Sequence, residues 1–278
     1  MLIRPPAVSG TFYPDDPTLL TLQVDHFLEE HATTQLPGTV LGLIVPHAGY
    51  RYSGFTAAAA YALLRHRQFS TAVIISPSHR EYFNGISIFE GDAYRTPLGL
   101  IETDTTLREK LRAHKGALTF SRFGHRTEHA VEVQLPFLQR INDELRILPI
   151  VMGDQRPELC MLLGRILAEE TDPSSTVIIA SSDLSHMHPH HEARRLDSIA
   201  TEAILALSPS RLLHDLAAGS TEACGGGPIS ALLQTCILHK ADGAHVLHQC
   251  TSGDVTGEES RVVGYLSAAI TRSPRYQD

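Results

Sequence analysis

Short apolar segments alternate along this chain with stretches that have the apolar spacing of amphipathic helices, and this alternation constrains the fold more than any other feature. Four of the apolar segments, at residues 39–46, 70–78, 145–153 and 175–183, are rich in Val, Ile and Leu and are typical of strands buried on both faces. Helical patterns separate them, and the connections are short. The sequence therefore predicts a single α/β domain over residues 1–278, with a mixed, mostly parallel central sheet and helices on both faces.

Boundary signals place several further elements. The segment "SGFTAAAAYALLRH" is predicted to be a helix with Ser53 as its N-cap. A helix in "GHRTEHAVEVQLPFLQRI" is predicted to begin near Thr127 and to be perturbed at Pro136, which lacks an N–H and crowds the preceding turn. Residues 85–102 are expected to form two or three short antiparallel strands, and "AHVLHQC" and "RVVGYLSAA" are expected to be strands as well.

The charge and composition of the chain argue against several classes of function. The net charge is −8, from 23 basic and 31 acidic residues, and the basic residues form no stripe, so we expect no nucleic-acid partner. For the same reason we expect no binding to an anionic membrane surface, and no apolar segment is long enough to span a bilayer. The N-terminal residues lack the apolar core of a secretion signal and the four cysteines have no CxxC spacing, which predicts a cytoplasmic protein with reduced cysteines.

Polar residues follow three of the four predicted strands at the point where each strand ends. The first, second and fourth strands lead into His47, His79 and Asp183. Ligands of open α/β sheets bind beyond the carboxyl ends of the strands, so these side chains are expected to share one site. Either histidine alone could simply be bonded to a loop carbonyl. Two imidazoles that converge at a sheet edge indicate a metal ion or a substrate oxyanion instead.

A third ligand is available in "ACGGGPIS", where Cys224 lies just before a glycine-rich entry to a predicted helix. The helix N-terminus and a bound metal would both favour its thiolate. The alternative is a small buried apolar residue, which suits Cys160 and Cys236 better. Asp183 and His186 in "SSDLSH" are predicted to be a supporting pair or a general acid and base, unless Asp183 only caps the next turn.

Four further residues are candidates for ligand binding. In "RTEHAVEVQLP", His129 and Glu132 share a helical face at i,i+3 spacing, as in some carboxylate-bridged metal sites. The helix dipole alone also explains acidic residues such as Glu128 in a first turn. Tyr50 and Tyr52 follow the first histidine and could clamp an anionic or aromatic side chain of a ligand.

With these residues identified, the chain resembles the Memo family, whose bacterial and archaeal members are often labelled AmmeMemoRadiSam system protein B. The matching motifs occur in family order from about residue 4 to residue 230, and they are "PAVSGTFYP", "PHAGYRYSG", "SPSH", "YRTPLG", "EHAVEVQLPFL", "SSDLSH" and "CGGGPI". The resemblance implies a fold similar to that of the class III extradiol dioxygenases, which are α/β enzymes with a two-histidine, one-carboxylate iron site.

The resemblance also implies a ligand set. In Memo-like proteins a cysteine replaces the carboxylate, so His47, His79 and Cys224 would be the metal ligands, with Asp183 and His186 beside the pocket. The implied metal is iron(II) or copper, and zinc also suits two imidazoles and a thiolate. The family label further suggests a radical-SAM protein as a partner.

Three functions fit these observations. The first is a non-haem iron or copper oxidoreductase, similar to a dioxygenase, that acts on oxygen or a small organic substrate, because a thiolate ligand favours redox chemistry. The second is a zinc-type hydrolase with Asp183 or His186 as general base. The third is an adaptor that binds a peptide or partner protein in the same crevice. The sequence favours the first.

Overall fold

A computed structural model of the chain describes residues 1–114, 116 and 118–274. Its strands are β1 (Ile3–Arg4), β2 (Thr39–Val45), β3 (Thr71–Pro77), β4 (Ile86–Phe89), β5 (Ala93–Thr96), β6 (Gly99–Glu102), β7 (Leu118–Ser121), β8 (Arg146–Met152), β9 (Thr176–Ser181), β10 (His186–His188), β11 (Gly243–Thr251) and β12 (Val262–Arg272). Nine of these strands form the central sheet, in the order β10-β12-β2-β9-β3-β8-β4-β7, with β11 also paired to β12.

The middle of this sheet is parallel and its flanks are antiparallel. β2, β9, β3 and β8 run parallel to one another, whereas β12 pairs with β2 and β4 pairs with β8 in the antiparallel sense. The predicted mixed α/β sheet is therefore confirmed. The antiparallel pairing expected within residues 85–102 occurs only between β5 and β6, which form a small separate sheet with β1, while β4 belongs to the central sheet.

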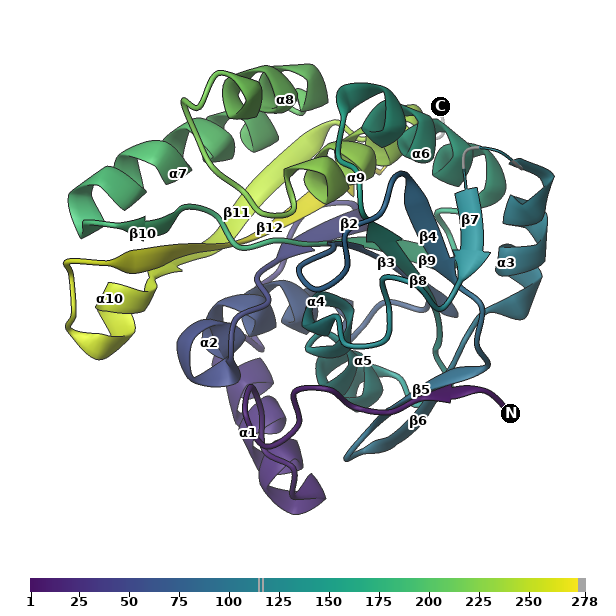
Figure 1. Cartoon of the computed structure of the whole chain (residues 1–278). Helices are drawn as coiled ribbons and strands as arrows, with labels where there is room; N and C mark the ends of the chain where they lie inside the picture. Colours follow the sequence, from purple (N-terminus) through teal and green to yellow (C-terminus); the bar gives the residue numbers. More distant parts are fainter. Residues whose placement is uncertain (115, 117, 275–278) are drawn as a thin grey trace.

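Helices cover both faces of the central sheet (Figure 1). The helices are α1 (Pro17–Glu30), α2 (Tyr50–Tyr61), α3 (Thr105–Leu111), α4 (His129–Glu132), α5 (Leu135–Ile141), α6 (Pro157–Glu170), α7 (His190–Leu205), α8 (Pro209–Ala217), α9 (Gly226–Leu238) and α10 (Ser252–Thr256), with 3₁₀ turns η1 (Ala62–Leu64) and η2 (Arg112–His114). In Figure 1, α1, α2, α4 and α5 lie below the sheet and α6 to α9 lie above it. Within the described part of the chain, no helix is long and apolar enough to cross a bilayer.

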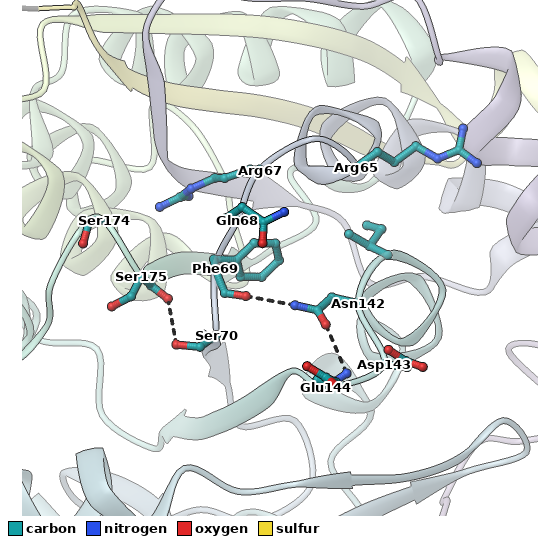
Figure 2. Close-up of a pocket in the computed structure, with 11 residues that line it drawn as sticks. Arg65, Arg67, Gln68, Phe69, Ser70, Asn142, Asp143, Glu144, Ser174 and Ser175 are labelled. Atoms are coloured by element: carbon teal, nitrogen blue, oxygen red, sulfur yellow. Dashed lines mark hydrogen bonds between the residues drawn. The ribbon is translucent and has the colours of Figure 1, made fainter.

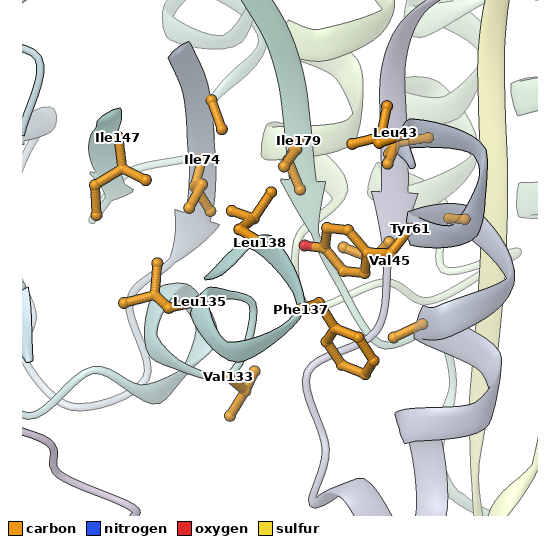
Figure 3. Packing of buried hydrophobic residues seen from close by; sticks show 14 of the residues in the cluster. Leu43, Val45, Tyr61, Ile74, Val133, Leu135, Phe137, Leu138, Ile147 and Ile179 are labelled. Carbon is orange, nitrogen blue, oxygen red and sulfur yellow. The ribbon is translucent and has the colours of Figure 1, made fainter. Parts of the chain in front are cut away.

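Each central strand contributes to two hydrophobic cores, because successive side chains point to opposite faces. Leu43 and Val45 of β2 belong to the core below the sheet, whereas Ile44 between them belongs to the core above it. In the lower core, Tyr61 of α2 stacks on Phe137 of α5, with ring centroids 5.0 Å apart, and both rings pack under the strands (Figure 3). Burial on both faces explains why these strands are uninterrupted apolar segments in the sequence.

Two helix boundaries differ from those predicted. α2 begins at Tyr50 with Gly49 at the N-cap position, so Ser53 is not the cap; its hydroxyl donates to the Ala48 carbonyl oxygen, 3.1 Å away. The helix expected from Thr127 onward is two short helices, α4 and α5. Pro136 does not interrupt a helix, because it lies in the first turn of α5, where a backbone N–H has no acceptor within the helix.

Several elements were not predicted, namely β1, β7, β10, α1 and α10. α1 has clear boundary signals, because the Asp16 carboxylate accepts a hydrogen bond from Leu19 N at 2.9 Å and Pro17 occupies the first turn. The short strands carry too few residues for a repeating pattern, and pairing with neighbours rather than local propensity determines them.

Candidate metal centre

Three adjacent strands bring the predicted residues together at one edge of the sheet. β2 and β3 both pair with β9, which lies between them. The second residue beyond each strand is His47 after β2, Asp183 after β9 and His79 after β3. Cys224 approaches from the loop before α9, a helix that packs against all three strands. Strands far apart in the sequence thus place four functional groups at the same carboxyl edge.

His47, His79 and Cys224 offer ligand atoms that all lie within 4.8 Å of one another. The Cys224 Sγ lies 3.2 Å from His47 Nε2, and the rings of His47 and His79 are 5.0 Å apart and nearly perpendicular. His47 is buried, Cys224 is partly buried and His79 is exposed. The cluster therefore opens toward solvent on the side of His79.

The electrostatic environment keeps the buried members of the cluster neutral. Burial, and then the neighbouring His79, lower the pKa of His47 to about 3, so its imidazole is uncharged at pH 7. Burial, and then the Asp183 carboxylate, raise the pKa of the Cys224 thiol. The N-terminus of α9 therefore does not by itself produce a thiolate; a bound cation would act in the opposite direction.

Asp183 and His186 lie near the cluster but do not pair with each other. The Asp183 Oδ1 accepts a hydrogen bond from His47 N at 2.7 Å, and burial raises the pKa of this carboxyl. His186 is exposed, and its Nδ1 lies 2.8 Å from the Leu184 carbonyl oxygen. No hydrogen bond between the two side chains occurs in the described structure. The predicted pairing is wrong because Asp183 already holds the His47 backbone and the chain turns away into β10.

Glu128 and His129 extend the cluster, since their ligand atoms and one of His79 also lie within 4.8 Å of one another. Glu128 Oε1 lies 2.9 Å from His79 Nδ1, and Oε2 accepts from His79 N at 2.6 Å. Burial raises the pKa of Glu128, but its hydrogen bonds with His79 and Ala130 outweigh burial and lower the pKa to about 2. The sequence left the helix dipole as a sufficient explanation for Glu128 and did not predict its contact with His79.

His129 is a third imidazole at the same place, with ring centroids 4.8 Å from His79 and 5.4 Å from His47. Its Nδ1 is buried and has no hydrogen-bond partner among the residues that the structure describes. Burial, and then His47, lower its pKa to about 4. Phe12 packs against the ring at 4.9 Å. The candidate binding residue His129 therefore lies within the cluster as a neutral imidazole, with its Nδ1 3.4 Å from Glu128 Oε1.

Glu132 lies elsewhere, although it is in the same helix as His129. Its buried carboxylate forms an ion pair with Arg4 and accepts hydrogen bonds from Tyr13 Oη and Ala7 N. These partners belong to the N-terminal segment, which includes the "PAVSGTFYP" motif. The predicted shared face of His129 and Glu132 is therefore not a metal site, because the buried guanidinium of Arg4 requires this carboxylate as its counter-charge.

The two candidate tyrosines also have different positions. Tyr50 is only 3% exposed and its hydroxyl donates to the Val133 carbonyl oxygen at 2.7 Å, so it is not free to clamp a ligand. Tyr52 is 38% exposed and remains accessible. Of the two, only Tyr52 could meet a ligand from solution.

A pocket of about 570 Å³ lies at the opposite edge of the sheet (Figure 2). Its lining residues include Ser70, Asn142 and Ser175, which precede β3, β8 and β9. The Asn142 amide donates to the Phe69 carbonyl oxygen at 2.9 Å, which ties two of these loops together. Neither ligand cluster borders this pocket, so the candidate centre and the pocket are separate features of the molecule.

The fold and the cluster define an α/β protein with a candidate metal centre of histidine and cysteine at the carboxyl edge of its parallel strands. A family model described as "Memo-like protein" matches residues 4–269. The chain therefore belongs to the Memo family, as its motifs suggested.

Relatives named as MEMO1 family proteins match nearly the whole chain. One from Methanosarcina barkeri is 38% identical over 96% of this chain and 100% of its own length. Those from Methanocaldococcus jannaschii and Aquifex aeolicus are each 36% identical over 96% of this chain and over 99% and 98% of their own lengths. Among solved structures, an uncharacterised protein from Escherichia coli K12 aligns with a TM-score of 0.47 and 14% identity, over 83% of this chain and 99% of that one.

Proposed function

We propose that this Memo-family protein binds iron(II) or copper through His47, His79 and Cys224 and is an oxidoreductase, similar to a dioxygenase, for a small organic substrate. The observation that carries the proposal is the convergence of two imidazoles and one thiol within 4.8 Å at a sheet edge. Three protein ligands of this kind leave coordination positions open for substrate or oxygen.

The donor set supports a transition metal over other cations. Magnesium and calcium prefer oxygen ligands, whereas nitrogen and sulfur donors suit iron, copper and zinc. A redox metal held here would supply electron-transfer and oxygen chemistry, and the thiolate would raise its electron density.

Neighbouring side chains would position the ligands and exchange protons. His129 is neutral at pH 7, because its pKa is lowered to about 4, and its Nδ1 lies 3.4 Å from Glu128 Oε1, which would hold the ring beside the proposed ligands. Phe12 packs against this ring at an interplanar angle of 59°. Asp183 fixes the backbone at His47 through its 2.7 Å hydrogen bond. His186 is exposed beside the cluster and can exchange protons with solvent.

The test is dioxygen uptake by the metal-free protein after anaerobic reconstitution with iron(II), copper(I) or zinc, against a panel of small organic substrates. We expect uptake with iron or copper in the wild type, loss of uptake in Cys224→Ser, and retention in Cys250→Ser. Cys250 is a matched control because it is also partly buried and its Sγ lies 3.1 Å from the Thr56 hydroxyl, outside the cluster.

Other results would support the alternatives. Tight zinc binding with hydrolysis of esters or amides, and no oxygen uptake, would favour the hydrolase. Binding of a peptide by a protein that holds no metal would favour an adaptor, with Tyr52 as the exposed contact. A radical-SAM protein is the partner that the family label suggests, and its co-purification with the tagged chain would support that association.

A further inference from the structure

A chain of buried hydrogen bonds runs from the lower core to His47. The Tyr61 hydroxyl donates to Gln134 Oε1 at 3.0 Å. The Gln134 amide nitrogen donates to the Pro46 carbonyl oxygen at 3.0 Å and to Ser181 Oγ at 2.9 Å. Ser181 Oγ in turn lies 2.9 Å from His47 Nδ1. Because the Pro46 carbonyl oxygen can only accept, the Gln134 amide nitrogen must face it, which fixes the orientation of the amide and places this nitrogen beside Ser181.

These contacts determine which nitrogen of His47 carries the proton. Ser181 Oγ lies 2.7 Å from the Ala130 carbonyl oxygen, which has no proton, so the single hydroxyl proton must lie between these two oxygens. Ser181 therefore has only acceptor capacity left for His47 Nδ1. The imidazole must donate from Nδ1, which leaves a lone pair on Nε2, the nitrogen 3.2 Å from Cys224 Sγ.

The same reasoning applies to His79 with a different partner. Its Nδ1 lies 2.9 Å from Glu128 Oε1, and an ionised carboxylate can only accept. His79 must therefore also donate from Nδ1, and in its neutral form the lone pair lies on Nε2. The Glu128 carboxylate is held in turn by the N–H groups of His79 and Ala130.

The supporting groups are all removed from water, since Gln134, Ser181 and Glu128 are at most 1% exposed. Buried polar groups destabilise a protein unless every hydrogen bond is made. Neutral histidine in water favours the opposite tautomer, with its proton on Nε2. Two separate sets of buried groups favour the minor tautomer. Both would leave an unprotonated Nε2 at the place where His47 and His79 meet.

We propose that Ser181, Gln134 and Glu128 are positioning residues that hold His47 and His79 as Nδ1–H tautomers, so that Nε2 of each is the ligand atom beside Cys224. The tautomer part of this inference stands on the hydrogen bonds alone. The ligand part rests on the proposed metal binding. Partners of this kind orient metal-binding imidazoles and raise their basicity in other metal sites.

The test begins with the full metal-free chain labelled with ¹⁵N in its histidine rings. Long-range ¹H–¹⁵N spectra distinguish protonated from unprotonated ring nitrogens, and His47→Gln and His79→Gln variants assign the two rings. We expect both rings of the wild type to be Nδ1–H tautomers. An Nε2–H tautomer at either ring in the wild type would overturn the proposal for that ring.

Two variants then separate the two networks. Ser181→Ala removes the acceptor at His47, and Glu128→Gln weakens the acceptor at His79, because an amide presents one donor group where the carboxylate presented only oxygens. Each variant should shift only its own ring toward the Nε2–H tautomer. Each should also weaken iron(II) binding, measured anaerobically against a chromogenic chelator, by roughly 10–100-fold.

Ser87→Ala is the matched control, because Ser87 is a buried strand serine whose hydroxyl donates to the Phe123 carbonyl oxygen at 2.7 Å, in β4. It should change neither tautomer nor affinity. A folded Ser181→Ala protein with unchanged His47 signals would overturn the positioning role, as would affinity losses equal to those of Ser87→Ala. If Ser181→Ala does not fold, the wild-type spectra still test the tautomers of both rings, and Glu128→Gln still tests the positioning role at His79. Shifted tautomers in a chain that never binds iron, copper or zinc would leave the positioning role intact and refute the proposed function.

Discussion

At the scale of single residues, one buried ion pair helps to attach the N-terminal segment to the rest of the protein. Arg4 and Glu132 are 4% and 0% exposed, and they lie 128 residues apart in the sequence. Removing one partner of such a pair leaves the other charge without compensation in the interior.

Glu132→Ala should therefore lower the free energy of unfolding by about 3–5 kcal/mol. Asp25→Ala is the control, since Asp25 pairs with Arg140 on the surface and its loss should cost under about 1 kcal/mol. Urea denaturation monitored by circular dichroism measures both. Equal losses in the two variants would contradict the anchoring role of Glu132.

A second residue-scale prediction concerns His125, which is buried between the Ser87 carbonyl oxygen and the Tyr94 hydroxyl. Burial lowers its pKa from 6.5 to about 3, so the folded state keeps it neutral while the unfolded state protonates it. The unfolded state therefore binds more protons in this range. The contribution of His125 to stability is fully present above pH 6.5 and is lost as the pH decreases from 6.5 toward 3.

His125 should contribute up to about 1.4 kcal/mol per pH unit to the slope of the unfolding free energy against pH. Denaturant titrations of the wild type and His125→Gln at several pH values in this window isolate it as the difference between the two slopes. Parallel curves for the two proteins would show that His125 is not held neutral.

The sequence predicted single residues well where the backbone alone determines their position. His47 and His79 follow buried strands, and this placement brings them to the sheet edge whatever their side-chain contacts are. Glu132 could not be predicted, because helical spacing shows which residues share a face and not which distant group binds the carboxylate. Gln134 and Glu128 were missed for the same reason.

At the scale of secondary structure, the packing of α6 against α9 depends on one glycine. A Cβ at Gly164 would lie 2.6 Å from Gln234 Cβ and 2.8 Å from the Ala231 carbonyl oxygen, so the two helices would have to separate. Since α9 also carries the loop of Cys224, their packing bears on the candidate centre.

Gly164→Ala should destabilise the protein by about 1–3 kcal/mol, even though alanine is the better helix former. Arg165→Ala, an exposed change in the same helix, should stay within about 0.5 kcal/mol of the wild type. Thermal or urea denaturation of both variants measures the difference, and a stabilised Gly164→Ala protein would show that the helices do not pack this closely.

The sequence predicted the long central strands, but it missed several short strands and the long helix α1. The central strands were recognised because burial on both faces produces long apolar segments. Short strands such as β7 and β10 depend on neighbours that are distant in the sequence, and no local pattern marks them.

At the scale of the whole molecule, strand order creates the candidate centre. The sequence indicated that the carboxyl ends would share an edge, but it gave no indication that β9 lies between β2 and β3. That order places Asp183 between the two histidine-bearing strands and brings α9 and Cys224 over the same edge. No local sequence pattern encodes the order of the strands, because this order arises from the crossover connections and from packing on both faces of the sheet.

The most direct test of the proposed metal centre is the metal content of the protein after anaerobic purification, measured by elemental analysis for wild type, Cys224→Ser, His79→Ala and Cys250→Ser. We expect stoichiometric iron or copper in the wild type and in Cys250→Ser, and loss of that metal in the other two variants. A folded wild-type protein without metal, or equal metal in all four proteins, would contradict it.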